Sequence, residues 1–130
     1  MKTGDDAFAI WGGISGVQST LSSLLTLGVP AEQVARLTAA NVAERFQIAR
    51  KGQIKIGFDA DLALVDINAT YELTRDMLLD RHKLSPYVGR TFRGLVRRTI
   101  ARGQTVFLDG KLVGNHRGRL VKPQRGPAHA

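Results

Sequence analysis

Hydrophobic residues recur at helical spacing near the start of the chain. Apolar positions from Ile14 to Leu25 lie three or four residues apart, with serines between them, which predicts an amphipathic helix. Gly28 is suited to end this helix, because glycine accepts the left-handed conformation of a helix C-terminus. Pro30 is suited to the first turn of a second helix.

The second helix is expected to bury Val34 and Leu37. Thr38 could cap a third helical segment, in which Phe46 points inward. We therefore predict that the stretch 14–47 is helical.

After Gln47 the pattern changes to alternation and short apolar runs, which are typical of strands. The predicted strands cover residues 53–56, 62–67, 94–101, 104–108 and 111–113. Turns are expected at 58–61, at Arg102-Gly103 and at Asp109-Gly110, the last being a strong hairpin signal. Residues 68–93 are predicted to be irregular, with a short helix around Arg75–Asp80. The expected order is helices first and then a small antiparallel sheet.

The length of 130 residues suits one domain or a piece of a larger one. It is far short of the roughly 250 residues of a complete (β/α)8 barrel. The absence of cysteine excludes disulfides, zinc ribbons, iron–sulfur clusters and cysteine nucleophiles. No apolar run approaches the length of a transmembrane helix, and two acidic residues near the N-terminus argue against a signal peptide. A cytoplasmic location is the expectation.

The positive charge is concentrated in the second half of the chain. Residues 1–74 hold 6 basic and 8 acidic side chains, whereas residues 75–130 hold 13 basic and 3 acidic ones. A nucleic-acid interface is therefore a hypothesis to weigh, and its best feature is an arginine-rich stretch with two aromatic residues, namely Arg90, Arg93, Arg97, Arg98 and Arg102 with Tyr87 and Phe92. Arg97 and Arg98 would face opposite sides of a strand, so the stretch makes no single stripe.

The residues that could carry catalysis or bind a metal form no clear constellation. His82, His116 and His129 are widely spaced and make no ligand pair, so none is expected to bind a metal. Asp59 and Asp61 could share a face and bind a cation, but a turn between strands explains them better.

The glycine-rich segment at residues 11–16 could present backbone amides to an anion or a polar ligand at a helix start. It lacks the Gly-Lys-Ser/Thr ending of a phosphate-binding loop. Ser15 has neither the glycine-flanked elbow of a hydrolase nor an evident base.

Residues 51–66, K-G-Q-I-K-I-G-F-D-A-D-L-A-L-V-D, resemble a signature of metal-dependent amidohydrolases, K-G-x-I-x-x-G-x-D-A-D-L-x-x-x-D. Residues 11–18, W-G-G-I-S-G-V-Q, and residues 81–90, R-H-K-L-S-P-Y-V-G-R, resemble two segments of allantoinases at which dihydroorotases and hydantoinases differ. The resemblance extends from Met1 to about Val121. One small departure is Val42, where many superfamily members have proline.

The resemblance implies an α/β protein: a (β/α)8 barrel with a small β-sandwich domain built from both chain ends. Such enzymes open the ring of allantoin, a cyclic ureide, to give allantoate in purine degradation. Their binuclear divalent metal centre, zinc or similar, is held by a His-x-His pair, a carboxylated lysine, two more histidines and an aspartate. None of those ligands has a counterpart in this chain.

The resemblance therefore implies a C-terminal fragment, inactive alone, whose partner is the missing N-terminal barrel portion of the same enzyme. Residues 1–50 would end the barrel domain, residues 51–121 would form part of the β-sandwich, and residues 122–130 would be a flexible tail. Gly12 and Gly13 are the expected substrate-binding residues, through their backbone. No catalytic, metal or cofactor-binding residue is expected, while a homo-oligomer is conceivable for the parent enzyme.

Two alternatives remain open at this point. One is the complementing subunit of a split amidohydrolase, in which a separate chain supplies the barrel. The other is a small basic protein that binds RNA or DNA, which we rank last. Neither a membrane partner nor a specific nucleic acid is expected.

Overall fold

The structure is a computed structural model that describes residues 13–114 and 118–124. Its helical part begins with a 3-10 turn, η1 (Val17–Ser19), which leads into α1 (Thr20–Thr26). A second helical rod runs without interruption through α2 (Ala31–Ala35), a π-helical turn, η2 (Arg36–Ala40), and α3 (Asn41–Arg45). The break between the two lies at Gly28, with φ of +80°, and Pro30, as predicted.

The helical prediction is confirmed over residues 17–26 and 31–45, but two details of it are wrong. Thr38 caps no helix, because the rod continues through it and its hydroxyl donates to Val34 O at 2.8 Å, a bond that threonine makes within helices. Leu37 and Phe46 are 45% and 60% exposed, whereas Val34 is buried as expected. In the described part of the chain the rod buries only a narrow strip, which contains Val34 and Ala43.

The sheet is antiparallel and has the strand order β1-β2-β3-β4, so each strand pairs with the next along the chain. Its strands are β1 (Leu62–Glu72), β2 (Thr91–Ala101), β3 (Gln104–Leu108) and β4 (Lys111–Leu112). The two tight turns are confirmed, with φ of +48° and +80° at Arg102-Gly103 and of +40° and +87° at Asp109-Gly110. Positive φ at both central residues matches the twist of a two-residue hairpin.

The first two strands are longer than predicted, because residues 70–72 pair with residues 91–93. A β-bulge in β1 explains why the sequence pattern did not indicate the full length of the strands. The Asp66 carboxylate accepts hydrogen bonds from the N–H groups of Asn68 and Ala69, at 3.2 and 3.1 Å, and the register shifts between Asp66 and Thr70. Alternation is lost across such a bulge, so the strand looks as if it ends there.

Residues 53–56, predicted as a strand, form no strand: Gln53 lies in a bend, Ile54 and Lys55 are irregular, and Ile56 lies in a turn. Ile54 and Ile56 are 91% and 101% exposed. A strand needs a neighbour for its N–H and C=O groups, and no strand of the described chain pairs with this segment. The predicted helix at 75–80 is also shorter than expected: η3 (Arg75–Met77) ends where Leu78 becomes extended.

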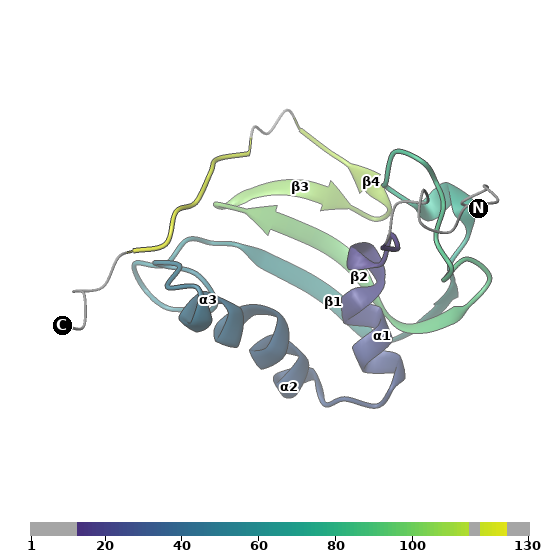
Figure 1. Cartoon of the computed structure of the whole chain (residues 1–130), viewed down its shortest axis with the longest axis horizontal. Helices are drawn as coiled ribbons and strands as arrows, with labels where there is room; N and C mark the ends of the chain where they lie inside the picture. Colours follow the sequence, from purple (N-terminus) through teal and green to yellow (C-terminus); the bar gives the residue numbers. More distant parts are fainter. Residues whose placement is uncertain (1–12, 115–117, 125–130) are drawn as a thin grey trace.

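Helix α1 docks on the sheet at Gly94 of β2 (Figure 1). The Ser22 hydroxyl is buried, donates to Gly94 O at 2.7 Å and accepts from the Tyr71 hydroxyl at 3.1 Å. A Cβ on Gly94 would lie 2.3 Å from Leu25 Cδ1, so glycine is what lets the helix approach this closely. The helix and the sheet are thus joined by hydrogen bonds as well as by packing.

A compact apolar cluster closes the end of the sheet next to α1. It consists of Leu73, Leu78 and Phe92, which are at most 4% exposed, with Tyr71 and Tyr87 packed against them. The Phe92 ring lies 6.0 Å from the Tyr71 ring and 6.1 Å, edge to face, from the Tyr87 ring. This cluster supports the loops described next.

Candidate functional site

Two loops far apart in the sequence meet at this end of the fold. We call residues 13–18 the entry loop, since it leads into the helices, and residues 77–90 the connecting loop, since it joins η3 to β2. Gln18 donates from Nε2 to Met77 O at 2.8 Å and accepts from Leu79 N–H at 2.9 Å. The Ser85 hydroxyl donates to Ser15 O at 2.9 Å. The side chains of Gln18 and Ser85 therefore tie the two loops together.

The predicted substrate-binding glycines lie at the start of the entry loop. Gly13 is exposed and has a φ of +97°, and among residues 13–114 and 118–124 no atom beyond its chain neighbours lies within 4 Å of where its Cβ would be. A side chain is therefore not what limits approach to this position. Gly12, the other predicted residue, lies outside the described residues. Whether either glycine contacts a substrate stays a prediction.

The connecting loop is itself fixed to the apolar cluster. Leu78 is buried in that cluster, and Lys83 donates through Nζ to Leu78 O. Tyr87 packs edge to face on Phe92, and its ring atom Cε2 lies 3.4 Å from where a Cβ on Gly16 would be. The entry loop therefore rests on a loop that the core holds in place.

A second polar constellation surrounds the Asp59-Ala60-Asp61 segment. Lys51 Nζ lies 3.0 Å from Asp59 Oδ2 and also contacts Asp61 Oδ2. Arg50 is 3.3 Å from Asp59, and the Arg102 N–H donates to Asp61 Oδ1 at 2.7 Å. These partners hold the two carboxylates, which supports a structural role for the pair. The turn itself lies earlier than predicted, at residues 56–58, and residues 59–61 are irregular.

The pKa values of this constellation follow from its contacts. The hydrogen bond to Asp61 is the main cause that raises the pKa of Lys51 above 10.5. The hydrogen bond from Lys51 is the main cause that lowers the pKa of Asp59 below 3.8. Burial acts to raise the pKa of Asp61, but its hydrogen bonds from Lys51 and Arg102 outweigh burial, so that pKa is also lowered. All three groups are charged near neutral pH.

We expect Lys51→Met to lower the free energy of unfolding near pH 7, because it leaves both carboxylates without their ammonium partner. A carboxylate with a lowered pKa stabilises the fold above its unfolded pKa, and this stabilisation is lost as the pH falls through its folded pKa. The raised pKa of Lys51 adds stability below about 10.5, lost as the pH rises through the folded pKa.

Urea titrations of the two proteins near pH 7 and below about pH 3 test this expectation, since protonated carboxylates no longer bind the ammonium group. The difference between parent and variant should shrink at the lower pH. Lys111→Met, which changes an exposed lysine on β4, is the control and should show no such dependence. A Lys51→Met effect of equal size at both pH values would contradict the ion-pair explanation.

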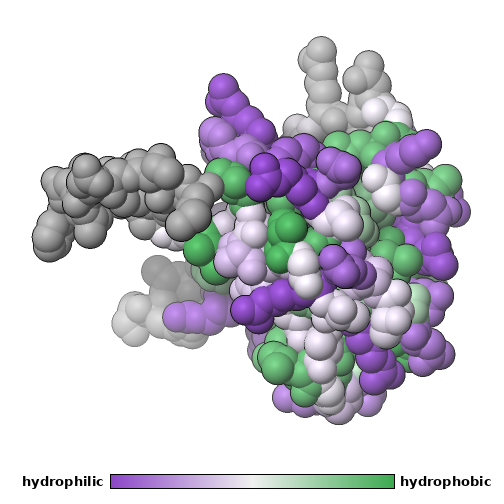
Figure 2. All heavy atoms as spheres, turned by 90° about the vertical axis from the view of Figure 1, so that its right-hand side faces the viewer, coloured by the Kyte–Doolittle hydropathy of each residue, from purple (hydrophilic) through white to green (hydrophobic). Residues whose placement is uncertain are grey.

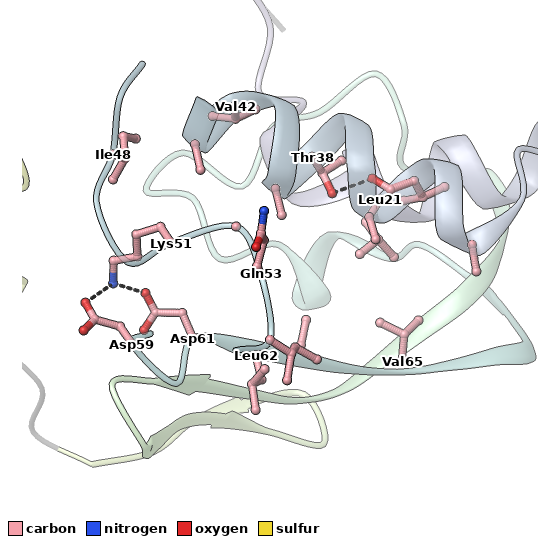
Figure 3. A pocket seen from close by; sticks show the side chains of 18 of the residues that line it. Leu21, Thr38, Val42, Ile48, Lys51, Gln53, Asp59, Asp61, Leu62 and Val65 are labelled. Carbon is pink, nitrogen blue, oxygen red and sulfur yellow. Dashed lines mark hydrogen bonds and ion pairs between the residues drawn. The ribbon is translucent and has the colours of Figure 1, made fainter. Parts of the chain in front are cut away.

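An apolar groove of about 730 Å³ lies between the helices and β1 (Figure 3). Its walls are mainly aliphatic side chains from the helices, the segment after them and β1, among them Leu21, Val34, Val42, Ile48, Leu62 and Val65. Lys51, Asp59 and Asp61 lie at one end and point toward one another. Because Lys51, Asp59 and Asp61 are paired with one another and the walls are mainly aliphatic, the groove has the character of a packing surface rather than of a reaction site.

The arginine-rich stretch is largely occupied by local partners. Arg97 Nη1 lies 3.5 Å from Asp109 Oδ1, and Arg97 Nη2 lies 3.8 Å from Asp66 Oδ2. Arg98 donates through Nε to the Thr105 hydroxyl. Arg93 donates through Nε to Ile67 O at 2.9 Å. On the face shown in Figure 2, hydrophilic and hydrophobic residues are interspersed. These observations give the nucleic-acid hypothesis no support.

His82 is exposed on the connecting loop, while His116 and His129 lie outside the described residues. Within residues 13–114 and 118–124, no three residues of the types His, Cys, Asp and Glu are grouped so that they could hold a metal ion. The described residues therefore do not fit a binuclear centre. In the same part of the chain no helix is long and apolar enough to span a membrane.

Comparison with known protein families resolves the identity of the fold. The sequence profile of the amidohydrolase family matches residues 13–106, which include the entry loop, the helices, β1 and β2. The chain belongs to the amidohydrolase family. The expected resemblance is thereby confirmed.

The curated relatives of this amidohydrolase chain are allantoinases. The chain is 54% identical to the allantoinase of Rubrobacter xylanophilus over 96% of its own length and 29% of the relative. It is 46% identical to the allantoinase of Solibacter usitatus over 95% of its own length and 28% of that enzyme. The chain thus spans less than a third of the length of the curated relatives that it matches.

Solved structures agree with the amidohydrolase assignment. L-hydantoinase from Arthrobacter aurescens matches 84% of this chain with a TM-score of 0.76 and 27% sequence identity, over 26% of the hydantoinase chain. The expected fold class, a helical part followed by an antiparallel sheet within a larger amidohydrolase, is confirmed.

Sequence reasoning missed the residues that join the loops. Gln18 and Ser85 each lie within a segment that resembles allantoinases, yet neither segment alone reveals that they meet. The signal that could have indicated the contact is that residues 11–18 and residues 81–90 both resemble allantoinases where related enzymes differ.

Proposed function

We propose that this chain is the C-terminal portion of an allantoinase-like cyclic amide hydrolase, which opens the ring of allantoin to give allantoate. The observation that carries the proposal is the 54% identity to an allantoinase over nearly the whole chain. The two loops that distinguish allantoinases in sequence also contact each other directly, which supports a shared role for them.

Within that enzyme, we assign residues 13–50 to the end of the barrel domain and residues 51–121 to the β-sandwich domain. The Gly13 backbone, with Gly12 before it, would bind the polar edge of the substrate ring. Backbone N–H and C=O groups suit a ureide, because the ring offers both amide hydrogens and carbonyl oxygens. An exposed glycine lets the ring approach closely.

The remainder of the enzyme would supply the metal ligands, since the described residues do not fit a metal centre. A metal centre held there would activate a water for attack on the amide carbonyl. The chain's own contribution is to position the ring and to cover the site from one side. On this proposal the chain has no hydrolase activity by itself.

The apolar groove supports the proposed partner, the missing barrel portion. Exposed apolar residues line it, including Val42 and Ile54. A surface of this kind is normally covered in a soluble enzyme. Barrel segments outside this chain would pack there.

A chimeric enzyme tests the proposal. The part of the Rubrobacter xylanophilus allantoinase that aligns with this chain is replaced by the chain, and hydrolysis of allantoin, hydantoin and dihydrouracil is measured. We expect hydrolysis of allantoin within about tenfold of the parent rate, and much slower hydrolysis of the other two. A soluble, folded chimera that hydrolyses only hydantoin or dihydrouracil would overturn the choice of substrate, and one that hydrolyses none would overturn the function.

The split-enzyme alternative is tested with the same materials. The truncated relative and this chain are expressed separately and then mixed. Activity that appears only on mixing would favour a complementing subunit. Activity only in the covalent chimera would favour a portion of a single polypeptide.

A further inference from the structure

The amide side chain of Gln18 occupies an unusual place between the two loops. It donates to Met77 O at 2.8 Å and accepts from Leu79 N–H at 2.9 Å, so it satisfies two backbone groups of the connecting loop at once. A two-point contact fixes the orientation of a planar amide as well as its distance. One side chain therefore joins the entry loop to the connecting loop at two points.

A second contact fixes the entry loop closer to its start, at Ser15. The Ser85 hydroxyl donates to Ser15 O at 2.9 Å and also accepts from Tyr87 N–H at 3.3 Å. Only one residue separates Ser15 from Gly13. The backbone around Gly13 is thus held by Ser85 on its near side and by Gln18 further along.

The connecting loop can serve as an anchor because the protein core holds it. Leu78 lies between the two residues that Gln18 contacts, and it is 2% exposed. Tyr87 packs on Phe92, which is 4% exposed. A displacement of this loop would disturb the apolar cluster, so the position of the entry loop is coupled to the core.

We infer that Gln18 is a positioning residue, which holds the Gly13 backbone in place for the substrate by locking the entry loop to the connecting loop. Ser85 assists it through Ser15. Neither side chain is required to touch the substrate. This inference rests on the proposed function for its kinetic consequence, whereas the lock itself is a property of this chain.

The lock is tested first in the chain itself, by amide hydrogen exchange of Gln18→Leu. This substitution removes both hydrogen bonds and keeps a side chain of similar size. We expect exchange at residues 13–19 to become about tenfold faster, while the paired amides of β1 and β2 are unchanged. Gln33→Leu, which changes an exposed glutamine on α2, is the matched control and should leave both regions as they were.

The kinetic consequence is tested in the chimeric allantoinase. Gln18→Leu should raise KM for allantoin about tenfold with a smaller change in kcat, because a loosened loop binds the ring less well. Gln18→Glu keeps the acceptor for Leu79 N–H but places a carboxylate oxygen against the Met77 carbonyl oxygen, so it should also raise KM. A merely structural role would lower the amount of active enzyme and leave KM unchanged.

The outcomes distinguish the lock, the positioning role and the proposed function. Unchanged exchange at residues 13–19 in Gln18→Leu, or equal acceleration in β1 and β2, would overturn the lock. Local acceleration with an unchanged KM would overturn the positioning role. An inactive unsubstituted chimera would overturn the proposed function, whereas the exchange experiment would still confirm or overturn the lock.

Discussion

Phe92→Ala should lower the free energy of unfolding by about 3–5 kcal/mol, the largest effect that we expect from a single truncation in this chain. Phe92 is 4% exposed and contacts both aromatic neighbours, Tyr71 and Tyr87, at ring distances of 6.0 and 6.1 Å. Alanine would remove this ring and leave a cavity beside Leu73 and Leu78, which the surrounding strand and loop could fill only in part.

Urea denaturation followed by circular dichroism measures this effect. Phe46→Ala is the matched control, because it removes the same ring from a side chain that is 60% exposed at the end of α3. Its expected effect is within about 0.5 kcal/mol. Equal losses in the two variants would mean that the cluster around Phe92 is not the core of the fold.

Gly52→Ala should lower the free energy of unfolding by about 2–5 kcal/mol, from two causes that act together. Gly52 has a φ of +81°, which residues with a Cβ adopt at a cost. A Cβ there would also lie 2.6 Å from Ala43 Cβ and 2.9 Å from the backbone oxygen of Ala39. The segment after α3 would have to move away from the helical rod.

Gly57 separates the two causes. It has a φ of +86°, but among the residues that the structure describes no atom beyond its chain neighbours lies within 4 Å of where its Cβ would be. Gly57→Ala should therefore cost only about 1–2 kcal/mol, the conformational part of the effect. The two variants are compared by thermal and urea denaturation. If Gly52→Ala lowers the free energy of unfolding no more than Gly57→Ala does, the contact between Gly52 and α3 is not tight.

Sequence patterns predicted those parts of the fold that depend on neighbouring residues. The apolar spacing around Leu21 and Leu25 and the Asp109-Gly110 turn act over a few residues, and both are found as predicted. The start of the predicted helix is wrong, because Ile14 precedes the first helical turn and Val17 is 92% exposed. Alternation at 53–56 failed because a strand depends on a distant partner, which the pattern does not contain. The Asp66 bulge hid the second half of β1 for a different reason, since one carboxylate bonding its own backbone shifts the register.

The candidate site was predicted in part. The resemblance of residues 11–18 placed Gly13 in the loop before α1, where the structure has it. It did not indicate that Gln18 and Ser85 connect that loop to residues 77–90, because their contacts join positions 59 to 70 residues apart. Long-range pairs of polar side chains leave no periodic signal in a single sequence.

The hydrogen bond from Ser22 to Gly94 joins residues that are 72 positions apart, whereas the hairpins of β2, β3 and β4 close over two-residue turns. Closing a long loop costs more entropy than closing a short one. The three hairpin-connected strands can therefore form early, and α1 docks on a surface that already exists. During synthesis on the ribosome the helices emerge before the sheet. The apolar side of α1 therefore stays uncovered until β2 has been made. We expect the nascent chain to bind chaperones during this interval, because its apolar surface is then exposed.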